Sequence, residues 1–145
     1  MKNLNKTQIA LLTITSIAIF FLVFSPHFKN PYPLHIDEWR HISSAISIEK
    51  GEYKENPISK LEIGFHIFLL ILNKFTNLVL VYKFLPALWA VLTSLILFYT
   101  TYKLTKKNFL IAFLTMLFFS SIKSNVNLLG LWFFTPLSFA IPFIF

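Results

Sequence analysis

Long apolar runs constrain the fold of this chain more than any other feature. Hydrophobic residues make up 56% of its 145 residues and charged residues only 13%, whereas charged residues are about 25% of an ordinary soluble domain. About 20 apolar residues suffice for a helix to cross a bilayer. We therefore predict an all-α, polytopic protein that resides in the cell membrane as a multi-pass protein. The expected transmembrane helices, about five in number, are 8–26, 61–75, 78–102, 108–123 and 126–145.

Two of these segments admit a second interpretation. Segment 8–26 has the basic flank and apolar centre of a signal peptide, but no small-residue cleavage site follows it. Segment 61–75 is short, so it either spans the bilayer or enters and leaves on one side. Five full spans with the N-terminus inside would leave more basic residues outside than inside, against the positive-inside tendency. A re-entrant 61–75 places the Lys103–Lys107 cluster inside and eases that conflict.

Charge is distributed very unevenly along the chain. All six carboxylates lie within residues 37–62, and the rest of the chain has none. The net charge of +7 comes from basic residues scattered over helix ends and loops, where they are expected to anchor the protein at the bilayer surface rather than bind nucleic acid. The chain has no cysteine, which excludes disulfides and thiolate metal sites.

The acidic segment belongs to a polar loop, 27–60, expected to be the first extracytoplasmic loop. Within it, residues 37–50 are predicted to form an amphipathic surface helix that ends at Gly51. Helical periodicity puts Trp39, Ile42, Ala45 and Ile46 on one face. It puts Asp37, His41 and Ser44 on the opposite face, away from the apolar side.

The start of this helix, HIDEWRH, gathers the side chains best suited to chemistry. Asp37 and Glu38 are adjacent, so on a helix they point to different partners, and one can act as a general base while the other orients a metal or a donor. His35, Asp37 and His41 could together hold a divalent cation, because residues four apart share a helix face. Asp37 could alternatively be the helix N-cap.

Simpler roles remain open for several other polar residues. Arg40 could pair with a nearby acid or a lipid phosphate, and Trp39 could be an interfacial anchor. His66 fits a buried, hydrogen-bonded histidine better than a ligand. Lys83 could extend to the membrane interface. Three glutamates at the end of the surface helix and just after it would only be solvated: Glu49, Glu52 and Glu55.

The order of these elements resembles the GT-C glycosyltransferases, in particular the protein O-mannosyltransferase and aminoarabinose transferase branch. Asp37-Glu38 corresponds to the acidic pair that these enzymes carry in the first extracytoplasmic loop. Pro57 corresponds to their proline-containing entry into the second helix. At the start of a long helix these enzymes have a basic residue, usually Arg, followed by Leu-Pro. The corresponding segment here is Lys83-Phe84-Leu85-Pro86, with Lys in place of Arg. The Lys103–Lys107 turn ends that helix as in the family.

The resemblance implies that residues 1–145 are the N-terminal part of a transmembrane catalytic domain, a truncated chain inactive alone. The implied reaction moves a sugar from a polyprenyl-phosphate-linked donor to an extracytoplasmic protein, glycan or lipid acceptor. Asp37 would be the base, with Glu38 its neighbour or a metal ligand, and Arg40 or Lys83 would contact the phosphate. The alternatives are a non-enzymatic transporter or accessory subunit, and a membrane protein that binds a divalent cation.

Overall fold

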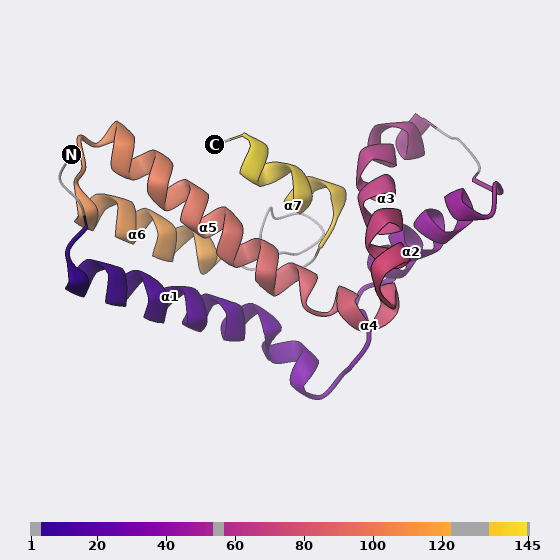
Figure 1. Cartoon of the computed structure of the whole chain (residues 1–145), viewed down its shortest axis with the longest axis horizontal. Coiled ribbons are helices and arrows are strands. Elements are labelled where there is room, and N and C mark those ends of the chain that lie inside the picture. The colour runs from indigo at the N-terminus through magenta and orange to yellow at the C-terminus, as the bar shows by residue number, and fades with distance from the viewer. Residues whose placement is uncertain (1–3, 54–56, 123–133, 145) are drawn as a thin grey trace.

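The computed structural model describes residues 4–53, 57–122 and 134–144, and these residues contain helices and turns but no strand (Figure 1). The all-α prediction is confirmed for this part of the chain. The elements in chain order are α1 (Lys6–Phe24), the 3-10 helix η1 (Ser25–Phe28), α2 (Ile36–Glu49), α3 (Pro57–Phe75), α4 (Leu78–Tyr82), α5 (Leu85–Leu104), α6 (Phe109–Ser120), α7 (Pro136–Ala140) and the 3-10 helix η2 (Ile141–Phe143).

Two helices in the described residues are long and apolar enough to cross a bilayer. They are α1 continued by η1, 23 residues in all, and α5, with 20 residues. The predicted segment 61–75 is helical within α3, and α6 has only 12 residues. Most of the predicted span 126–145 lies outside the described residues. The five-span arrangement therefore stays a prediction, while an all-helical chain with two candidate spans is what the structure contains.

The predicted span 78–102 corresponds to two helices in the structure, because the helix is interrupted between α4 and α5. Pro86 stands near the start of α5 and has no N–H to donate to the carbonyl of Tyr82. A proline inside a helix also clashes with that carbonyl, four residues earlier. The helix consequently stops at Tyr82 and restarts at Leu85, which places Pro86 where its fixed φ is well tolerated.

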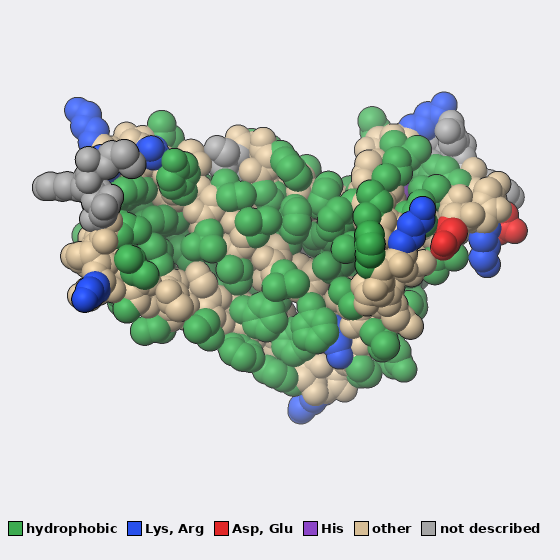
Figure 2. Space-filling view, viewed as in Figure 1, with side chains coloured by type: hydrophobic (Ala, Val, Ile, Leu, Met, Phe, Trp, Pro, Cys, Tyr) green, Lys and Arg blue, Asp and Glu red, His purple; other side chains and the backbone are tan. Residues whose placement is uncertain are grey.

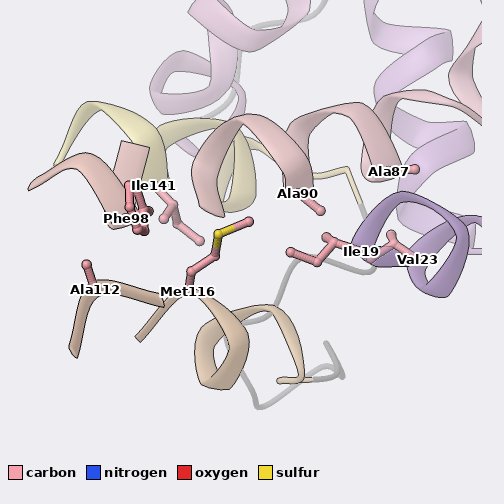
Figure 3. Packing of buried hydrophobic residues seen from close by; sticks show 8 residues of the cluster. All are labelled: Ile19, Val23, Ala87, Ala90, Phe98, Ala112, Met116 and Ile141. Atoms are coloured by element: carbon pink, nitrogen blue, oxygen red, sulfur yellow. The ribbon is translucent and has the colours of Figure 1, made fainter. Parts of the chain in front are cut away.

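One hydrophobic cluster holds α1, α5 and α6 together (Figure 3). Small side chains lie at the contacts, and Ala87, Ala90 and Ala112 are fully buried. Such residues let helix backbones approach closely, which is typical of helices packed within a membrane. The larger members of the cluster fill the space that the alanines leave, and they are Ile19, Val23, Phe98, Met116 and Ile141.

A second cluster joins α2 and α3 to the start of the α4–α5 region. In Figure 1, α3 runs across the direction of α1 and α5, at the end of the molecule where α1 finishes and α5 begins. Ile42 and Ala45 of α2 pack against Phe65 and Leu69 of α3, as the apolar face of the predicted surface helix requires. This packing sets the position of the polar residues described below.

Gly51 ends α2 in the way that the sequence predicts. Its φ of +69° is in the left-handed region. The Gly51 N–H donates to the carbonyl of Ile48, and the Glu52 N–H donates to that of Ser47, the two hydrogen bonds of a Schellman motif. Glycine is preferred here because a Cβ is strained at positive φ.

The two described glycines should respond oppositely to alanine. Gly51→Ala should lower the free energy of unfolding by about 1 kcal/mol through backbone strain. Gly64, inside α3, is not at positive φ, and an added Cβ would meet no atom within 4 Å. Gly64→Ala should therefore raise that free energy by about 0.5–1 kcal/mol. Thermal unfolding in detergent micelles, followed by circular dichroism, measures both, and a shift in the same direction would contradict the assignment.

Candidate functional site

The start of α2 is fixed by a capping box made from His35 and Glu38. His35 is the N-cap, and its Nδ1 accepts a hydrogen bond from the Asp37 N–H at 3.2 Å. Glu38, at the third helical position, accepts from the His35 N–H. The alternative prediction that Asp37 caps the helix is therefore wrong. The Asp37 carboxylate is not used for capping, although Oδ2 lies 3.3 Å from His35 Nδ1 and would pair with it if that ring were protonated.

Glu38 is a buried carboxyl whose two oxygens are held by backbone amides. Oε2 accepts from the N–H groups of Leu34 and His35 at 2.9 and 3.2 Å, and Oε1 accepts from the N–H of Phe134 at 3.4 Å. Burial raises the pKa of Glu38, against the lowering effect of these three amides. Sequence reasoning gave Glu38 a catalytic or metal-binding role. That role stays a prediction, and in the structure the two oxygens join the start of α2 to Phe134.

Two further hydrogen bonds hold the segment around Phe134 in place. The Tyr82 hydroxyl donates to the carbonyl of Phe134, and Trp89 Nε1 donates to the carbonyl of Ser138 at 3.0 Å. They hold the segment against α4 and α5, and Glu38 holds it against α2.

A cavity of about 410 Å³ lies where α2, α3 and α7 meet. Its polar lining comes from α2 and α3, with α7 supplying a mainly apolar wall. The volume falls within the range of small-molecule sites, about 300–1,000 Å³. The lining residues are Asp37, Arg40, His41, Leu61, Glu62, Thr135, Pro136, Leu137 and Ala140.

His41 does not lie on an exposed polar face, as the helical pattern predicted. It is 1% exposed, because the side of α2 that meets α3 includes His41 as well as Ile42. Its Nδ1 lies 3.0 Å from Nε2 of His66, and Nδ1 of His66 lies 2.9 Å from the hydroxyl of Tyr53. The expectation that His66 is buried and hydrogen-bonded is confirmed.

Glu62 is the cavity residue that sequence reasoning did not single out. Its Oε1 lies 3.5 Å from Nη2 of Arg40, and its Oε2 faces Nδ1 of His41 at 3.9 Å and Nε2 of His66 at 4.0 Å. Arg40 thus has the nearby acid that its simpler interpretation required. The spacing of Glu62 and His66, four apart on an apolar helix, was the signal that could have revealed the pair.

The structure separates some of the predicted site residues. His35 lies beside Asp37, while His41 joins Glu62 and His66. Lys83 stands at the α4–α5 junction with its ammonium 5.0 Å from the ring of Phe84, and it is not among the residues that line the cavity. Trp39 is partly exposed and donates through Nε1 to the carbonyl of Pro33.

No protein-family model matches this chain, and neither does any curated protein or solved structure.

Proposed function

We propose that this protein is a membrane glycosyltransferase that moves a sugar from a polyprenyl-phosphate-linked donor to an extracytoplasmic acceptor. The observation that carries the proposal is that Asp37 and Arg40 line one cavity. A half-exposed carboxylate and a half-exposed guanidinium then face the same bound molecule. Transfer from a phosphate donor needs one group of each kind.

The two side chains would divide the reaction between them. The Asp37 carboxylate takes the proton of an acceptor hydroxyl as the oxygen forms its bond to the anomeric carbon. The bond from that carbon to the phosphate oxygen breaks, and the electron pair leaves with the polyprenyl phosphate. Arg40 stabilises the charge on this leaving group and can bind two phosphate oxygens at once. Arg40 is favoured over Lys83 for this role because it lines the cavity.

The exposed surface of α1 supports placement in a membrane. Ile14, Ile17 and Phe21 are each more than half exposed, and burying such side chains away from water is favourable by about 1.5–3 kcal/mol each. Figure 2 shows hydrophobic side chains spread over the face formed by α1 and α5, with Lys and Arg side chains mainly toward its edges. A bilayer would remove this surface from water.

The relative direction of the helices also supports one orientation. The N-terminal end of α1 and the C-terminal end of α5 lie at the same end of the molecule (Figure 1). Lys6 therefore shares a side with the Lys103–Lys107 turn, as the re-entrant interpretation of 61–75 requires. With this basic side in the cytoplasm, the cavity beside α2 lies toward the opposite, extracytoplasmic side.

Removal of the gene from its own organism tests the proposed reaction. We expect the loss of one class of extracytoplasmic glycoconjugate, detected by mass spectrometry, together with accumulation of its polyprenyl-phosphate sugar donor. Returning the gene should restore both. An unchanged glycoconjugate profile with no accumulated donor would contradict the proposal, and a defect confined to the uptake of a solute would favour a transporter.

A further inference from the structure

Three side chains of α2 and α3 converge on one point, and two of them line the cavity. His41 Nδ1, His66 Nε2 and Glu62 Oε2 form a triangle with sides of 3.0, 3.9 and 4.0 Å. In the described residues, they are the one group of this kind whose ligand atoms all lie within 4.8 Å of one another. The ligand atoms of a tetrahedral zinc site are about 3.3 Å apart, given bonds of 2.0–2.1 Å. To reach that spacing, the Glu62 oxygen must approach by about 0.7 Å and the two ring nitrogens must separate by about 0.3 Å.

The neighbours of these three groups orient them toward the centre of the triangle. The Tyr53 hydroxyl can accept the proton of His66 Nδ1 at 2.9 Å, which leaves Nε2 of His66 with its lone pair. Arg40 engages Oε1 of Glu62, which leaves Oε2 directed at the histidines. Hydrogen bonds of this kind, to the atom that does not bind the metal, are typical of metal ligands.

The close approach of the two imidazole rings also suits a pair of ligands. Without a metal, one proton is shared between the two rings in their 3.0 Å contact, and a metal ion would take the place of that proton.

We propose that His41, Glu62 and His66 bind a divalent transition-metal ion of the Zn²⁺ type. Two imidazole nitrogens and one carboxylate oxygen favour zinc over Mg²⁺ or Ca²⁺, which take oxygen ligands. His41 and Glu62 also line the cavity, so the fourth coordination position opens toward the space occupied by a bound molecule. Three protein ligands and one open position are the arrangement of catalytic rather than structural zinc sites. Metal binding at this site does not depend on the proposed sugar transfer, because the site binds the metal ion without a donor or an acceptor.

The test measures metal binding by the purified chain in detergent micelles, after removal of metals with a chelator. Titration with Zn²⁺ alone, with equilibrium dialysis and elemental analysis, should give about one ion per chain. His66→Ala and Glu62→Gln should weaken binding by at least about 10- to 100-fold, the loss typical even of outer-sphere partners. His35→Ala is the matched control, since His35 lies outside the triangle, and it should bind like the wild type.

Two results would overturn the proposal. One is wild-type binding no tighter than that of His66→Ala. The other is a loss of binding in His35→Ala with retention in His66→Ala, which would move the metal to the His35, Asp37 and His41 set. Glu62→Gln keeps the size of a side chain only 19% exposed, so it separates loss of a ligand from loss of the fold. Co²⁺ absorption gives a second readout, because removal of Glu62 should change the visible spectrum of the bound ion.

Discussion

Asp37→Asn should reduce sugar transfer by about 10²- to 10⁴-fold, the usual contribution of a general base. Asparagine has the shape of aspartate but cannot take a proton from the acceptor hydroxyl. Capping of α2 depends on His35 and Glu38, so the substitution should leave the helix in place. The rate is measured in membranes that contain the protein, with a labelled polyprenyl-phosphate sugar and mass spectrometric detection of the product.

Glu49→Gln is the matched control for this substitution. Glu49 is another exposed carboxylate of α2, at the opposite end of the helix, where its Oε2 accepts from Asn73 at 3.3 Å. It is not among the residues that line the cavity, and its substitution should leave the rate unchanged. A normal rate in Asp37→Asn would remove Asp37 from the reaction. Equal losses in both variants would point to a general effect of charge in the loop.

The local features of the site could be predicted from the sequence because each depends on neighbouring residues. The helix near 37–50, its stop at Gly51 and the burial of Ile42 and Ala45 follow from periodicity and from one glycine. Asp37 and Arg40 line one cavity, and their part in a reaction stays a prediction.

The features that were missed depend on contacts between distant segments. His41 was placed on a polar face because its own helix gives no sign that α3 covers that side. The contact between His41 and His66 joins residues 25 apart, and Phe134 is 96 residues from Glu38. No pattern within a single helix specifies such pairs. The choice of His35 rather than Asp37 as N-cap was missed because histidine is not a preferred cap.

Glu38→Ala should lower the free energy of unfolding by about 2–4 kcal/mol, because it leaves three buried or half-buried N–H groups without their acceptor. The loss of the bond to Phe134 should also loosen the α7 wall of the cavity. Glu38→Gln keeps one acceptor oxygen and turns an amide donor toward another donor, so about half of that loss is expected. Thermal unfolding in detergent micelles measures both variants, and Glu49→Gln again serves as the exposed control.

The stability difference between wild type and Glu38→Gln should depend on pH in a definite direction. A side chain that only fills space would produce no such dependence. The folded pKa of Glu38 is raised above its unfolded value, chiefly by burial, so the folded state binds its proton more tightly. The stability of the wild type relative to Glu38→Gln is therefore full below the unfolded pKa of about 4.3 and falls as pH rises through the folded pKa.

The groups that face Glu38 electrostatically are His27 and Tyr82. The charge of His27 lowers the pKa of Glu38, but by less than burial raises it. The difference in Tm between wild type and Glu38→Gln should thus decrease as the pH rises above about 4.3. An increase would mean that the three amides outweigh burial and keep Glu38 ionised.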